Sequence, residues 1–128
     1  MDERIEALLK KAQVFLRSAA VLIELEDYDS TASRAYFAMF YAAQAALLYD
    51  GGSVNSAQGT RSAFTTRFVD HGPLPPRAGE VFARASELQE IGDYASSFAV
   101  SEADAEFILS EAEAFVNSLE RLVERFLV

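Results

Sequence analysis

The stretch from Tyr28 to Tyr49 constrains the fold of this 128-residue chain more than any other segment. Every residue from Ala35 to Ala43 is apolar or aromatic, and Gln44 is the only plainly polar residue between Ala43 and Tyr49. The stretch contains no Gly or Pro and is rich in Ala, which favours a helix about 33 Å long. A helix that is apolar on nearly all sides must be covered by other elements. Because the apolar run is shorter than the roughly 18 residues of a membrane span, we predict the central helix of a soluble bundle, or a helix shared between a bundle and a partner.

The rest of the chain predicts four further helices. Residues 2 to about 25 carry apolar side chains at helical spacing, and a short break at Glu26–Ser30 makes this first helix antiparallel to the central one. Gly51-Gly52 ends the central helix, and a shorter helix follows at roughly residues 56 to 70. The next helix begins at Pro75 or Pro76 and ends at Gly92, before a connector from Asp93 to Val100.

Polar residues suited to helix capping stand at the expected starts. Asp27 and Asp29 are candidates for the central helix, and Asn55 or Ser56 for the short one. Ser101 to Asp104 resembles a capping box before the last helix. The last helix has an apolar seam at alternating intervals of four and three, which suits packing at a shallow angle: Ile108, Ala112, Phe115, Leu119, Leu122 and Phe126. We therefore predict a single all-α domain, residues 1–128, with an up-and-down bundle of four long helices plus a shorter fifth.

Composition narrows the class of function. With 51% apolar and 24% charged residues the chain is globular, and it has no cysteine. Its N-terminus is charged and amphipathic rather than signal-like, so we expect a cytoplasmic protein.

The net charge is −9. Between Arg84 and Arg121 there is no Lys or Arg, but there are nine acidic residues: Glu87, Glu90, Asp93, Glu102, Asp104, Glu106, Glu111, Glu113 and Glu120. Phosphate binding needs clustered cations, so the charge disfavours RNA, and we expect neither DNA nor a membrane as a partner.

Motifs for common chemistries are missing. Gly51-Gly52 follows a helix and is a helix stop rather than a phosphate loop. His71 is the single histidine, which argues against a histidine-based metal site or catalytic triad. We expect no cofactor and no metal.

Arg34 is the most informative polar residue because it lies within the most apolar helix. A buried arginine needs a partner, and Asp93, Asp27 and Asp29 are candidates for a carboxylate clamp. Alternatively, Arg34 contacts a ligand or an RNA phosphate. The residues that we single out as a functional or structural polar cluster are Arg34, Tyr41, Asp93, Tyr94, Asp27 and Tyr28.

The central stretch also resembles a known signature. Asp27-Tyr28, followed by Ala32-Ser-Arg-Ala-Tyr-Phe-Ala-Met-Phe-Tyr-Ala-Ala43, is similar to the Arg-Ala-Tyr-Tyr-Ala-Met-Phe-Tyr-Ala run of small prokaryotic HEPN-domain proteins. Further matches follow in order at Gly59, Phe64, Phe68-Val69 and Gly92-Asp93-Tyr94. The resemblance covers about residues 5 to 126.

This resemblance implies an all-α bundle that forms a homodimer and acts beside a minimal nucleotidyltransferase in a toxin–antitoxin pair. Many HEPN proteins are metal-independent ribonucleases that use an Arg-x4–6-His motif, in which the imidazole performs acid–base work and the arginine holds the phosphate.

The chain departs from that ribonuclease pattern. Arg67-x3-His71 has a different spacing and place, Gln89 stands where the family usually has an arginine, and Ser56-Ala-Gln-Gly59 replaces the common Ser-His-Lys-Gly. We therefore expect a non-catalytic or weakly catalytic binding module with a nucleotidyltransferase-like partner. The alternatives are a metal-independent ribonuclease toxin and a bundle that binds a nucleotide or another small ligand.

Overall fold

The computed structural model describes residues 2–52 and 56–125. Its elements are α1 (Glu3–Glu24), α2 (Tyr28–Tyr49), α3 (Ala57–Phe64), the short π-helix η1 (Thr65–Asp70), α4 (Pro76–Tyr94) and α5 (Glu102–Arg125). No strand occurs among these residues, which confirms the predicted all-α bundle of four long helices plus a shorter fifth. Within the described ranges, no helix is both long enough and apolar enough to cross a membrane.

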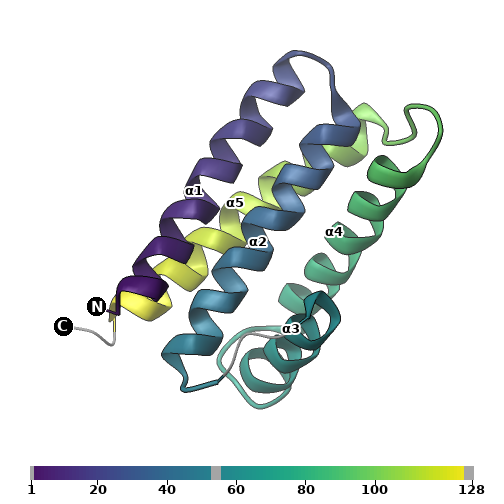
Figure 1. Cartoon of the computed structure of the whole chain (residues 1–128). Coiled ribbons are helices and arrows are strands. Elements are labelled where there is room, and N and C mark those ends of the chain that lie inside the picture. Colours follow the sequence, from purple (N-terminus) through teal and green to yellow (C-terminus); the bar gives the residue numbers. More distant parts are fainter. Residues whose placement is uncertain (1, 53–55, 126–128) are drawn as a thin grey trace.

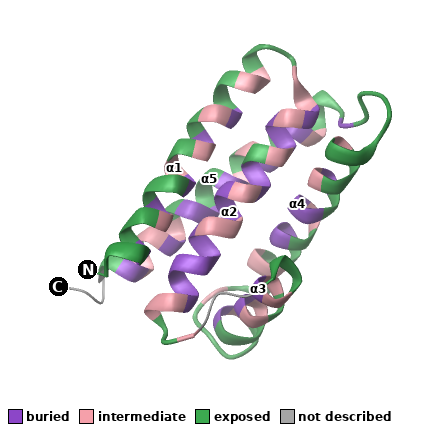
Figure 2. Cartoon of the chain, in the orientation of Figure 1, coloured by how far each residue is buried: buried purple, intermediate pink, exposed green. Residues whose placement is uncertain are grey.

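The central helix α2 begins and ends at the predicted residues, Tyr28 and Tyr49. It packs against α1, α3, α4 and α5, and Figure 1 shows α1 and α4 on its two sides with α5 behind it. Buried positions occur along most of its length (Figure 2). Many of them are alanines, whose small side chains let the neighbouring helices approach closely: Ala32, Ala35, Ala38, Ala42, Ala43, Ala45 and Ala46.

Aromatic rings join the other helices to α2. Tyr36 of α2, Phe64 of α3, Phe82 of α4 and Phe115 of α5 are all buried. Ring centroids in this group lie between 5.2 and 5.9 Å apart, in tilted or edge-to-face arrangements. Such pairs add to the stabilisation from buried area, so this cluster fixes α3 and α4 against the centre of the bundle.

The helix starts follow the predicted capping chemistry in three places. The Asp27 carboxylate accepts from the backbone N–H of Ser30 at 3.2 Å. Ser56 Oγ accepts from Gly59 N–H at 3.1 Å, and Ser101 Oγ accepts from Asp104 N–H at 3.1 Å. These bonds satisfy backbone donors that a helix start leaves free. The other cap candidate, Asn55, and the last residue of the predicted seam, Phe126, lie outside the described residues.

Asp29 has a different role from the predicted cap. It is buried, and its carboxylate accepts from the backbone N–H groups of Ala99 and Val100 at 3.0 and 2.8 Å. The connector before α5 is therefore tied to the start of α2.

α4 runs two residues past the predicted end at Gly92, and a Cβ added at Gly92 would lie 3.0 Å from the carbonyl oxygen of Asp29. Gly92 thus permits a close approach between α4 and α2.

Two glycines of α4 provide a matched test of this close approach. We expect Gly92→Ala to lower the free energy of unfolding by about 1–3 kcal/mol, because its methyl group meets backbone atoms of Asp29 that cannot move aside easily. Gly79→Ala should raise it by up to about 1 kcal/mol, because a Cβ there makes only ordinary contacts and alanine favours the helix. Urea unfolding followed by circular dichroism measures both changes. Equal stabilities for the two variants would contradict the close packing at Gly92.

Candidate functional site

A depression of about 450 Å³ lies over α2, on the side of this helix that its neighbouring helices leave uncovered. Its walls come from α1, α2 and α4, which lie side by side in Figure 1. The lining residues are Phe15, Leu22, Ser30, Ser33, Arg34, Phe37, Tyr41 and Asp93. We call this site the α2 depression. It brings together three residues of the predicted polar cluster, namely Arg34, Tyr41 and Asp93.

Arg34 is exposed rather than buried, so the predicted carboxylate clamp is wrong. Its guanidinium carbon lies 4.9 Å from the centroid of the Phe15 ring, and it forms no ion pair with any residue in the described ranges. The reason is geometric: α1 and α4 pack on either side of α2 and leave the stripe that carries Arg34 uncovered. Its positive charge is therefore available at the surface.

The three carboxylates expected to bind Arg34 have other partners. Asp93 accepts from Ser33 Oγ at 3.1 Å and from Gln89 Nε2 at 2.7 Å. Asp27 caps α2, and Asp29 holds the connector before α5. Gln89, at the position where the resemblance implies an arginine, thus supplies a neutral hydrogen bond to Asp93 instead of a second positive charge.

A second cation beside the depression was not predicted. The Lys11 ammonium lies 4.5 Å from the centroid of the Tyr41 ring, and that ring packs edge-to-face on Phe15 at 5.2 Å. Lys11 and Arg34 are thus both held over aromatic faces by cation–π attraction. The i,i+4 spacing of Lys11 and Phe15 places them on one face of α1, but nothing in the sequence shows that Tyr41 meets this face.

The other members of the predicted cluster lie elsewhere. Asp27 is a cap, and Tyr94 is 81% exposed at the end of α4. Tyr28 lines a separate depression with several glutamates. Burial, together with the Glu102 and Glu26 carboxylates and a hydrogen bond to Glu102, raises the pKa of the Tyr28 hydroxyl above its ordinary value. The predicted cluster is therefore not a single site.

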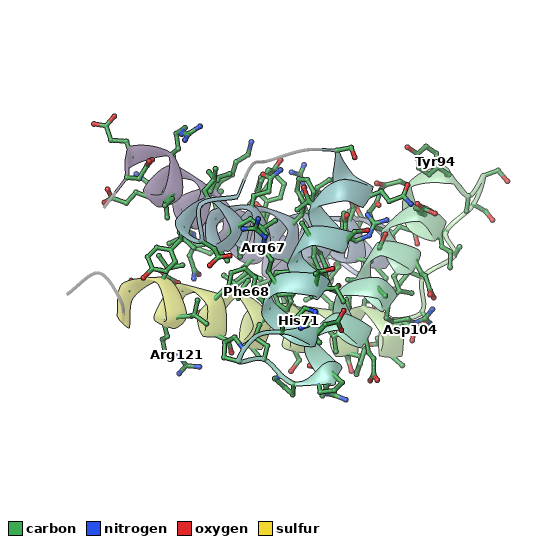
Figure 3. All side chains as sticks on the ribbon, turned by 90° about the horizontal axis from the view of Figure 1, so that it is seen from below. Arg67, Phe68, His71, Tyr94, Asp104 and Arg121 are labelled. Carbon is green, nitrogen blue, oxygen red and sulfur yellow. The ribbon has the colours of Figure 1, made fainter. Side chains whose placement is uncertain are left out.

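The single histidine is far from the α2 depression. His71 follows η1, before the start of α4, whereas Asp93 is 17 residues beyond Pro76, the first residue of that helix, and so about 26 Å further along its axis. Figure 3 shows His71 beside η1 and Tyr94 at the far end of α4. Arg67, the arginine nearest to it in sequence, pairs with Asp50 at 3.0 Å. The described part of the chain has no group of three or more His, Cys, Asp or Glu residues that could hold a metal ion.

The fold and this site describe a small helical bundle with a cationic and aromatic surface formed by α1 and the central helix α2. The HEPN domain model matches residues 5–122. The chain therefore belongs to the HEPN-domain family, as its central stretch indicated.

Relatives of known name match most of the chain. A UPF0332 protein of Thermotoga maritima is 31% identical over 96% of this chain and 93% of its own length. A protein of Methanocaldococcus jannaschii named "Putative toxin MJ0605" is 30% identical over 98% of this chain and 92% of its own length. Among solved structures, TT1696 from Thermus thermophilus superposes with a TM-score of 0.79 over 92% of this chain and 97% of that chain, at 18% identity. The last comparison supports the fold alone.

The exposure of Arg34 has a consequence for stability. We expect Arg34→Ala to lower the free energy of unfolding by less than about 1 kcal/mol, because only an exposed cation–π contact is lost. Asp29→Ala should cost about 2 kcal/mol or more, because it removes the acceptor of a buried backbone N–H. Chemical denaturation of both variants measures the difference. If Arg34→Ala lowered the free energy of unfolding as much as Asp29→Ala, this result would support the carboxylate clamp at Arg34.

Proposed function

We propose that this chain is a non-catalytic or weakly catalytic HEPN binding module that works in a toxin–antitoxin-type pair. The observation that carries this proposal is the α2 depression, which combines Arg34 and the neighbouring Lys11 with partly buried aromatic rings but is not lined by histidine. Cations without carboxylate partners, beside aromatic rings, suit recognition of an anionic or aromatic group on a partner.

The placement of polar groups supports recognition over RNA cleavage. Acid–base work on an RNA 2′-hydroxyl requires a proton acceptor within hydrogen-bond reach and with a pKa near neutrality, a role that histidine usually fills. His71 lies at the opposite end of α4 from Asp93. Gln89 also replaces the positive charge that would hold the scissile phosphate. The carboxylate of Asp93 is engaged by Ser33 and Gln89 at the rim of the depression.

The partner in this proposal is a nucleotidyltransferase-like protein, as the family resemblance implies. Arg34 and Lys11 would form ion pairs with acidic side chains of that protein, while the aromatic edges give apolar contact. The M. jannaschii relative carries the word toxin in its name, and this supports a toxin–antitoxin context for the present chain.

We also propose that two copies associate through α2. Phe40 is only partly buried, and its ring packs on Tyr36 and Tyr41 at 6.1 and 5.7 Å, which extends the aromatic surface along α2 from the depression. A second copy packed there would cover apolar area that the bundle leaves open. It would also place the α2 depressions of the two copies next to the interface.

Copurification tests the recognition surface. A tagged chain should retain a coexpressed nucleotidyltransferase-like partner protein, and Arg34→Glu should reduce the retained amount at least tenfold, because a repulsive charge replaces an attractive one. Arg121→Glu is the matched control: Arg121 is exposed on α5, so retention should stay within twofold of the unmodified chain. Equal retention by both variants would exclude the α2 depression as the binding surface.

A metal-independent ribonuclease toxin is the second candidate, because relatives bear toxin names. Two results distinguish it from the binding module. A ribonuclease would degrade RNA in the presence of a metal chelator, and it would arrest growth on overexpression, and both effects would disappear in Arg34→Ala. The proposed binding module gives neither effect.

A nucleotide- or small-ligand-binding bundle would instead show saturable nucleotide binding that depends on Arg34 and Tyr41.

The dimer has its own test. Size-exclusion chromatography with light scattering at micromolar concentration should give twice the chain mass of 14.1 kDa. Phe40→Glu should give a monomer, because a carboxylate cannot be buried in an apolar interface without a large cost. Phe107→Glu, at a residue 41% exposed on α5, should leave the dimer intact. A monomeric unmodified chain would rule out this association.

A further inference from the structure

A second depression of about 350 Å³ lies between α3, η1 and α4. It shares no lining residue with the α2 depression. Its polar wall consists of Arg61, Ser62, Thr65 and Thr66, and Phe82 and Ala83 of α4 supply the apolar side. No acidic residue lines it. We call it the Arg61 depression.

Arg61 is held in place by a neutral group. Its Nη1 donates to the hydroxyl oxygen of Tyr36 at 2.9 Å, and Tyr36 is only 2% exposed. Arg61 forms no ion pair within the described ranges, whereas Arg4, Arg67, Arg77 and Arg84 each pair with a carboxylate. In a chain with a net charge of −9, an arginine positioned by a buried phenol keeps a full positive charge and several free donors.

Three residues with hydroxyl groups line the depression together with Arg61. Ser62, Thr65 and Thr66 belong to the last turn of α3 and the first residues of η1. Their side chains form no hydrogen bond among the described residues. η1 is a π-helix, a widened turn that is rare and occurs often at functional sites. These hydroxyls, and the guanidinium N–H groups that Tyr36 does not accept from, suit an anion rich in acceptor oxygens.

We infer that the Arg61 depression binds a phosphoryl group, either inorganic phosphate or the phosphate of a larger molecule. A phosphate dianion offers acceptor oxygens in several directions, which matches a guanidinium fork combined with three separate hydroxyls. A carboxylate offers two oxygens in one plane and would leave some of these donors unused. The apolar side formed by Phe82 and Ala83 leaves space for the group that carries the phosphate. This inference does not depend on the proposed function of the α2 depression.

A phosphate titration of the ¹⁵N-labelled full chain, followed by NMR at constant ionic strength, tests the site. Inorganic phosphate should shift the amide signals of Ser62, Thr65, Thr66 and Gly79 in a saturable manner. Arg61→Gln should weaken this binding roughly tenfold or more, because a charge-assisted hydrogen bond is lost. Tyr36→Phe should weaken it severalfold, because the guanidinium is no longer held. Arg67→Gln, which removes an arginine already paired with Asp50, should change it by less than twofold.

Dimethyl phosphate distinguishes the source of the phosphoryl group. Binding of inorganic phosphate alone indicates a free or terminal phosphate, and equal binding of dimethyl phosphate indicates a phosphodiester within a chain. Three outcomes would overturn the inference: no saturable shifts, shifts centred on Ser30 and Ser33 of the α2 depression, or equal losses in Arg61→Gln and Arg67→Gln. If Arg61→Gln does not fold, Arg61→Lys, which retains the charge, takes its place in the phosphate titration. The titration should be unchanged in Arg34→Glu, so its failure and the failure of the proposed function are separate results.

Discussion

The packing of α2 is the constraint on which the rest of this structure depends. A helix with apolar side chains in nearly every direction must be covered on most of its sides. Here α1, α4 and α5 surround it, and α3 closes one end. The buried alanines of α2 allow this close approach, and Gly92 allows it where α4 meets the first turn. These neighbours cover α2 on two sides and behind, but they leave one stripe of its surface open. Arg34 lies on this stripe.

The open stripe divides the family signature between the core of the bundle and its surface. Ala35 and Met39 of the signature are buried, and they fix the helices around α2. Arg34 and Tyr41, in the same run, line the surface depression. A short helical motif can therefore specify the fold with one face and place polar and aromatic side chains at the surface with the other, because residues one turn apart share a face. The resemblance to HEPN proteins consequently says more about the scaffold than about the chemistry that a given member performs.

The sequence was sufficient to predict the helices, but it was not sufficient to predict which side chains contact each other. The bounds of α2 follow from its apolar run and its flanking cap and glycines, which are local signals. Arg34 was expected to be buried because periodicity shows how many sides of a helix are apolar, but not which side its neighbours leave open. The contacts of Lys11 with Tyr41 and of Arg61 with Tyr36 join residues far apart in the sequence. They depend on how helices pack, and no spacing rule within a single segment predicts them.

The distribution of paired and unpaired charge decides where this acidic chain can meet an anion. A net charge of −9 weakens long-range attraction, but this effect is screened beyond roughly 10 Å at 0.1 M salt. At contact distance the local partners matter more. Lys11 and Arg34 are held against ring faces and Arg61 against a phenol hydroxyl, and these neutral groups orient a cation without cancelling its charge. The argument from net charge against anionic partners therefore applies to the acidic α5 side and not to the two depressions that these cations border.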